Sequence, residues 1–75
     1  MNNIRRKLIK MELEKIETIL SNLEYIKDDE EDAFDNMPES LQCSERGETS
    51  QDAIDSLDNA ISSLEDALEE LQGIN

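Results

Sequence analysis

The chain has 75 residues, of which 20 are Asp or Glu, 7 are Lys or Arg and none is His, so its formal net charge is −13. A chain this short buries too little surface to be comfortably stable alone. Cys43 is the only cysteine, which excludes an internal disulfide, and without His there is no zinc-binding set. We therefore expect one domain, residues 1–75, that self-associates or docks on a partner.

The charge and hydropathy pattern excludes several classes of protein. No apolar run approaches the roughly 20 residues needed to cross a membrane. The basic residues Arg5, Arg6 and Lys7 are not followed by the apolar core of a signal peptide. Together with the lack of a disulfide framework, this predicts a cytoplasmic protein without membrane association. The net charge also argues against direct nucleic-acid binding, because phosphates would be repelled.

A first long helix is predicted over residues 3–35. Its main apolar seam has the alternating four- and three-residue spacing of a heptad pattern, and consists of Ile9, Leu13, Ile16, Leu20 and Leu23. The same rhythm resumes at Glu30, Phe34 and Met37, with Lys27 as a polar interruption. A second apolar row widens the stripe and indicates more than one neighbouring helix; it contains Leu8, Ile19, Ile26 and Ala33.

A second long helix is predicted over residues 45–72. Its seam has the same spacing and contains Ile54, Leu57, Ile61, Leu64, Leu68 and Leu71. A parallel row of small residues, which would let another helix approach closely, contains Ala53, Ala60 and Ala67. Gly73 is a candidate C-cap. Ser44 is the favoured N-cap, and the alternative start at Thr49 forms a capping-box-like pair with Asp52.

The connector is predicted over residues 36–44. Pro38 ends the first helix at or before Met37, because the residue before a proline avoids the helical region. Pro38–Leu41 is compatible with one short helical turn capped by Asn36. A short connector predicts an all-α antiparallel helical hairpin. The uncovered apolar rows predict that this hairpin dimerises into a four-helix bundle, most simply as a two-fold homodimer.

The residue types needed for common catalytic chemistry are missing. Without His there is no Ser-His-Asp triad and no histidine general base, and Cys43 has no His to activate it. The only glycines are Gly47 and Gly73, so there is no glycine-rich phosphate loop. The acidic run lacks the central glycine of a calcium-binding loop. We therefore expect no enzyme activity, no catalytic residue, no metal site and no cofactor.

Charge is strongly polarised along the chain. Residues 1–15 contain five basic and two acidic residues, whereas residues 16–75 contain two basic and eighteen acidic ones. Antiparallel pairing would place the basic N-terminal segment beside acidic C-terminal turns, so internal or dimer-related pairing of these cations is one interpretation. The acidic residues are either a solvated surface or a recognition patch for a basic protein, with nucleic-acid mimicry as one form of recognition. The patch comprises Asp28, Asp29, Glu31, Asp32, Asp35, Asp52 and Asp55.

The connector supports a second hypothesis, in which an oligomer sequesters a small anionic metabolite or signalling nucleotide. The start of a helix can bind an anion through its free backbone N–H groups. The candidate ligand-binding residues are Asn36, Ser44 and Arg46, joined by Arg5 or Arg6 of another subunit. A third hypothesis is a structural or assembly subunit.

One stretch of the sequence has a distinctive likeness. The segment NMPESLQCSERGE, residues 36–48, is followed by an Ala-Ile-Asp-x-Leu rhythm from Ala53. This combination resembles small acidic helical proteins of phages and mobile elements of Gram-positive bacteria. The resemblance implies an accessory role in the host cytoplasm, for example inhibition of a host defence system through a basic host protein. It transfers no site residue.

Overall fold

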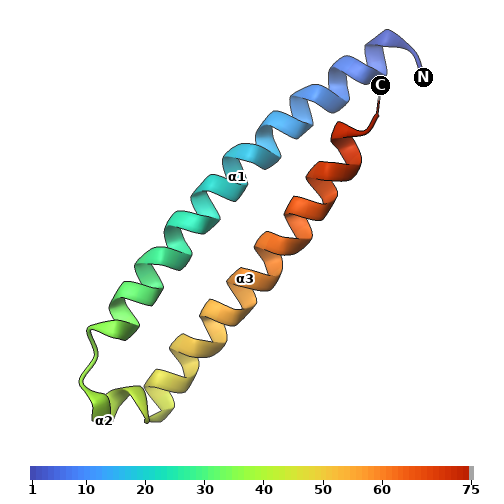
Figure 1. Cartoon of the computed structure of the whole chain (residues 1–75). Coiled ribbons are helices and arrows are strands. Elements are labelled where there is room, and N and C mark those ends of the chain that lie inside the picture. The colour runs from blue at the N-terminus through green and yellow to red at the C-terminus, as the bar shows by residue number, and fades with distance from the viewer. Residues whose placement is uncertain (75) are drawn as a thin grey trace.

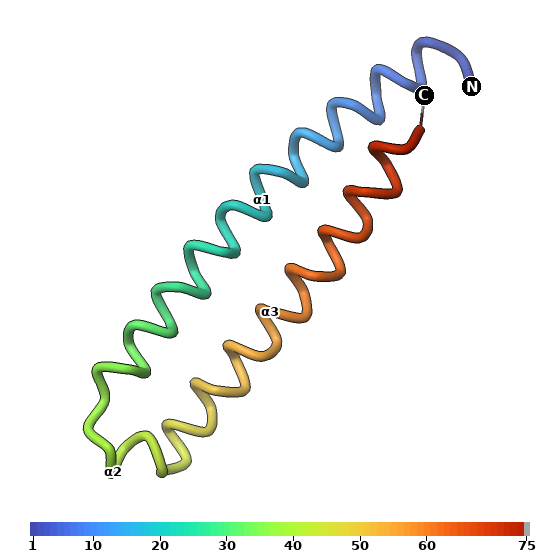
Figure 2. Tube along the Cα trace, in the orientation of Figure 1, coloured from blue at the N-terminus to red at the C-terminus, as the bar shows by residue number. Residues whose placement is uncertain are grey.

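The computed structural model describes residues 1–74, which form two long antiparallel helices and one short helix between them (Figure 1). Helix α1 spans Asn3–Asp35, α2 spans Glu39–Gln42 and α3 spans Glu45–Gln72. The long helices therefore have the bounds predicted from sequence. The molecule is a rod of 58 × 14 × 13 Å. The α2 connector lies at one end of this rod, and residues 1 and 74 lie at the other (Figure 2).

Both ends of α1 are closed by asparagines. Asn2 is the N-cap, and its Oδ1 accepts a hydrogen bond of 2.8 Å from the backbone N–H of Arg5. At the other end, the backbone N–H of Asn36 donates to the carbonyl of Asp32 at 3.0 Å. The expectation that Asn36 caps the short turn is therefore wrong, because Asn36 closes α1 and Pro38 occupies the N-cap of α2.

The connector is tied to both long helices. The Gln42 side-chain amide donates a hydrogen bond of 3.0 Å to the carbonyl of Phe34, near the end of α1. Ser44 is the N-cap residue of α3, so the alternative start at Thr49 is wrong. The Ser44 hydroxyl does not cap the helix, since it donates to the carbonyl of Leu41 instead. Glutamates in the first turn of α3 still interact favourably with its dipole.

The core of the hairpin is the predicted heptad seam. Leu20 of α1 and Ile61 of α3 are its two buried apolar side chains among residues 1–74, and the remaining seam residues are half-buried. Gly47 and Ser50 are also buried, and they extend the seam of α3 towards the connector. The apolar rows outside the seam remain exposed in the single chain, as predicted: Leu8, Ile19, Ile26, Ala33, Ala53, Ala60 and Ala67.

Gly47 sits where the connector backbone crosses the first turns of α3. A Cβ atom at this position would overlap the backbone carbonyl of Gln42 and lie 2.6 Å from the carbonyl oxygen of Leu41. These obstacles are backbone atoms, which cannot rotate away as a long side chain can. The missing side chain of Gly47 therefore allows the tight return of the chain from α2 into α3.

We predict that Gly47→Ala lowers the free energy of unfolding by about 1–3 kcal/mol, the usual cost of overpacking. The intrinsic helix propensity of alanine would by itself raise stability by about 1 kcal/mol, so the sign of the change is informative. Urea unfolding followed by helical circular dichroism measures it. Gly73→Ala is the matched control, since its added Cβ would meet nothing nearer than the Glu70 carbonyl oxygen at 3.4 Å. A Gly47→Ala variant as stable as Gly73→Ala would contradict the packing argument.

Candidate functional site

The hairpin has two chemically different faces, one on each side of the seam. Side chains advance by about 100° per residue around a helix, so residues seven apart share a flank. In an antiparallel pair, the row one residue before Leu20 on α1 and the row one residue before Ile61 on α3 lie on the same side of the pair. We call this side the apolar face; it carries Ile19, Ile26, Ala33, Ala53, Ala60 and Ala67. The opposite side, the carboxylate face, carries Glu17, Glu24, Glu31, Asp58 and Glu65.

Lys27 joins the seam to the carboxylate face. Its half-buried side chain lies in the seam, and its Nζ is 3.0 Å from Asp58 Oδ1 and 3.8 Å from Glu31 Oε1. The hydrogen bond to Asp58 raises the pKa of Lys27 above its ordinary value of 10.5, against a smaller opposing effect of desolvation. The nearby charges of Asp58, Glu31 and Asp28 raise this pKa further. The polar interruption predicted at Lys27 is thus satisfied by α3.

A second polar contact lies in the seam, nearer the connector. The Ser50 hydroxyl donates a hydrogen bond of 2.6 Å to Glu30 Oε1, and Ser50 is buried. The sequence reasoning missed Ser50, although Ser50 continues the heptad spacing of Ile54 and Leu57 towards the connector. A buried hydroxyl needs a partner, and Glu30 supplies it from the facing position of α1.

The seven predicted acidic residues gather at the connector end of the rod, because the end of α1 lies beside the start of α3. We call this set the distal acidic surface. Glu31 is half-buried and its other members are exposed. Among residues 1–74, Glu31 alone of this set takes part in an ion pair. Helix geometry places Asp28, Glu31 and Asp35 on the carboxylate side of α1, whereas Asp29 lies on the opposite flank.

The residues predicted to bind a small anion do not form one site within the chain. Asn36, Ser44 and Arg46 lie at the connector end, whereas Arg5 and Arg6 lie at the other end of a rod 58 Å long. The Asn36 backbone N–H and the Ser44 hydroxyl are engaged in local hydrogen bonds. Arg46 is exposed and takes part in no ion pair among residues 1–74. A composite anion site would therefore need a second copy of the chain.

The predicted internal pairing of the N-terminal cations is not observed. Among residues 1–74, ion pairs involve Lys15 and Lys27, and none involves Arg5, Arg6, Lys7 or Lys10. The contacts of Glu30 with Ser50 and of Lys27 with Asp58 set the helix register. In this register α3 ends before it reaches the first turns of α1, which project beyond it (Figure 1). The projecting cations have no α3 carboxylate opposite them.

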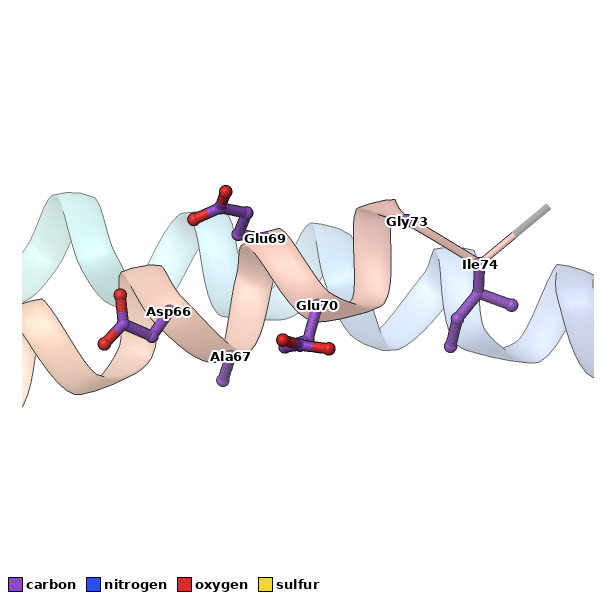
Figure 3. Close-up of a pocket in the computed structure, with 6 residues that line it drawn as sticks. All are labelled: Asp66, Ala67, Glu69, Glu70, Gly73 and Ile74. Atoms are coloured by element: carbon purple, nitrogen blue, oxygen red, sulfur yellow. The ribbon is translucent and has the colours of Figure 1, made fainter.

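A shallow hollow lies along the last turns of α3, at the end of the rod opposite the connector. Its lining residues are Asp66, Ala67, Glu69, Glu70, Gly73 and Ile74. All six come from one continuous segment, and Glu69 extends to one side of α3 while Ala67 and Ile74 extend to the other (Figure 3). No second element of the fold closes this hollow, so its geometry does not define a ligand cavity.

Other kinds of site find little support in the part of the chain that the structure describes. No group of three or more acidic or cysteine side chains there could hold a metal ion, and no helix there is long and apolar enough to span a bilayer. Cys43 is an exposed free thiol. Comparisons with known protein families, with curated proteins and with solved structures each gave no match to this chain. Functional inference therefore depends on the two faces and the two charged ends of the rod.

The raised pKa of Lys27 predicts a specific alkaline dependence of stability. A raised folded-state pKa contributes stability that is fully present below the unfolded pKa, near 10.5, and is lost as the pH rises through the folded value. We predict that Asp58→Asn destabilises the hairpin at about pH 8, and that the difference from wild type shrinks at a strongly alkaline pH above the raised folded-state pKa, where Lys27 has lost its proton. Urea unfolding at the two pH values measures this change.

Asp52→Asn is the control for this experiment. It removes the same charge from α3, but Asp52 takes part in no ion pair among residues 1–74. Its effect on stability should therefore change much less between the two pH values. If the two variants respond equally to pH, the Lys27–Asp58 pair is not the cause.

Proposed function

We propose that the protein is a non-catalytic binding protein that acts through its distal acidic surface on a basic protein partner, as a four-helix bundle of two hairpins. The observation that carries the proposal is the gathering of seven carboxylates from two helices at one end of the rod. Such a concentration of one sign of charge steers an oppositely charged partner and strengthens its encounter.

The arrangement of these carboxylates works against helix stability, which supports a role in recognition. Asp28 and Asp32, and likewise Glu31 and Asp35, are like charges four residues apart, and each such pair costs about 0.2–0.5 kcal/mol. They also lie at the C-terminal end of α1, where the helix dipole disfavours anions. A basic partner would relieve both effects. Carboxylates displayed along a narrow rod suit a groove that otherwise accommodates phosphates.

The resemblance of residues 36–48 to small phage proteins supplies a biological setting for this proposal. In that setting the partner is a basic protein of the host cytoplasm, and occupation of its nucleic-acid-binding groove would inhibit a host defence system. The negative charge of the chain, −13 overall, favours a protein partner over nucleic acid itself.

An anion-sequestering role is the competing proposal, and the position of Arg46 is the observation in its favour. Arg46 is an exposed cation at the connector end without an ion pair among residues 1–74. If this role is the correct one, small anions will copurify with the protein, and Arg46→Ala will release them. If the protein is instead a structural or assembly subunit, neither changes to the distal acidic surface nor Arg46→Ala will affect its role.

We predict that partner binding depends on where the carboxylates lie and not only on their number. The immobilised protein should capture a basic protein from host lysate at low salt and release it at high salt. The variant with Asp28, Asp32, Asp35, Asp52 and Asp55 changed to Asn should lose this capture, because the attraction at the connector end is removed. Mass spectrometry of the captured fraction identifies the proteins and any small anions.

A control variant carries the same net charge but is altered in the half of the rod away from the connector. It has Glu14, Glu17, Glu65 and Glu69 changed to Gln and Asp66 changed to Asn, and all five residues are exposed. This variant should keep the capture nearly intact. Equal loss by both variants would show that overall charge alone is responsible, and it would reject the distal acidic surface as the binding site.

A further inference from the structure

The apolar face remains without a partner in the single hairpin. Its central residues on α1, Ile19 and Ile26, are 47% and 51% exposed although they belong to a regular heptad row. The facing row on α3 consists of alanines, which leave room for another helix to approach. A continuous apolar face of this kind marks an interaction site.

The total exposed area indicates the size of the missing contact. The accessible surface is 5797 Å², whereas a compact monomer of 8.6 kDa exposes about 4,700 Å² by the usual scaling with mass. The excess of about 1,100 Å² is comparable to the roughly 800 Å² that each partner buries in a standard protein–protein interface. A second hairpin would therefore suffice to cover the apolar face.

The charge distribution indicates both which molecule covers the apolar face and how that molecule is oriented. The basic first turns of α1 project beyond α3, and the distal acidic surface lies at the opposite end of the same rod. Two copies stacked with their connectors at opposite ends bring each basic end onto the partner's acidic end. Two copies stacked with their connectors together would place carboxylates against carboxylates. The chain is thus complementary to a reversed copy of itself.

We propose that the apolar face is the docking surface for a second copy of this chain, with the two connectors at opposite ends of the bundle. This inference rests on the proposed four-helix bundle and names the face and direction of its assembly. The row of α1 with seven-residue spacing contains Arg5, Glu12, Ile19, Ile26 and Ala33, and Ile19 is its midpoint. An antiparallel α1 pair therefore places Ile19 against Ile19 of the partner subunit.

The same arrangement divides the distal acidic surface into two parts. Asp29 lies on the flank of α1 that turns towards the apolar face, so it is near Arg5 of the partner subunit in the assembly. Asp28, Glu31 and Asp35 lie on the carboxylate side and stay outside the dimer contact. Self-association thus uses the projecting cations and leaves most of the acidic surface available to another protein.

Sedimentation equilibrium of two double variants tests the face. Ile19→Lys with Ile26→Lys adds charges to the apolar face, and it should raise the dimer dissociation constant by about a hundredfold or more. Met11→Lys with Tyr25→Lys makes the same charge change at exposed apolar residues on the outer side of α1; Tyr25 is 78% exposed. This control should remain dimeric at wild-type concentrations. Equal dissociation of the two variants would overturn the assignment of the face.

Cys43 tests the direction without any change to the apolar face. In the wild-type protein, a short bifunctional maleimide should not join Cys43 to Cys43 of the partner subunit, because the connectors lie at opposite ends. In the variant Asn3→Cys it should join residue 3 of one chain to Cys43 of the other. The rod is 58 Å long, so a short linker cannot join these two positions within one chain. Peptide mass spectrometry identifies the joined residues.

The outcomes separate this inference from the proposed assembly. A wild-type protein that is monomeric at all concentrations overturns the four-helix bundle and this inference with it. A stable dimer that is cross-linked through Cys43 on both chains keeps the bundle but overturns the reversed direction. A dimer with the residue 3–Cys43 link and with selective dissociation of the Ile19→Lys, Ile26→Lys variant supports both.

Discussion

The apolar seam between α1 and α3 is the interaction on which the rest of the structure depends. Two helices can cover only one stripe of each other, and among residues 1–74 that stripe has a single layer of buried apolar side chains, Leu20 and Ile61. Side chains outside the seam contact water or another molecule. The hairpin therefore has a defined core and also two long faces of opposite character, one apolar and one lined with carboxylates.

Polar contacts within the seam give the hairpin its alignment. A purely apolar heptad seam tolerates sliding by whole heptads, because each layer resembles the next. The Lys27–Asp58 and Glu30–Ser50 contacts are satisfied only in the observed register, and polar contacts at a helix–helix seam are a known means of fixing register. Gly47 helps to set the alignment at the connector end, because it lets the connector close against α3 without forcing the helices apart.

The helices and the seam could be predicted from sequence because long periodic segments bounded by Pro38 and Gly73 carry a strong local signal. The connector was harder to predict from the sequence. Asn36 suits both the end of one helix and the start of the next, and proline's fixed φ let Pro38 occupy the N-cap of α2.

The candidate site could be predicted from the sequence only in part, for a related reason. The residues of the distal acidic surface can be picked out from the sequence, but their gathering at one end of the rod follows from the antiparallel fold. The failed internal pairing of Arg5 has a geometric cause. Sequence gives the lengths of α1 and α3 but not their register, and the register leaves the first turns of α1 beyond the end of α3. Ser50 was missed because a serine carries no hydropathy signal, although its heptad position was available.

The shape of the hairpin affects how the protein behaves in solution. A particle of 58 × 14 × 13 Å experiences more friction than a sphere of the same mass and tumbles fastest about its long axis. Its elution from a sizing column would therefore overstate its mass, so that even a single chain could pass for a larger species. Nuclear spin relaxation would show the same anisotropy, because amide vectors in both long helices lie nearly parallel to the axis of the rod.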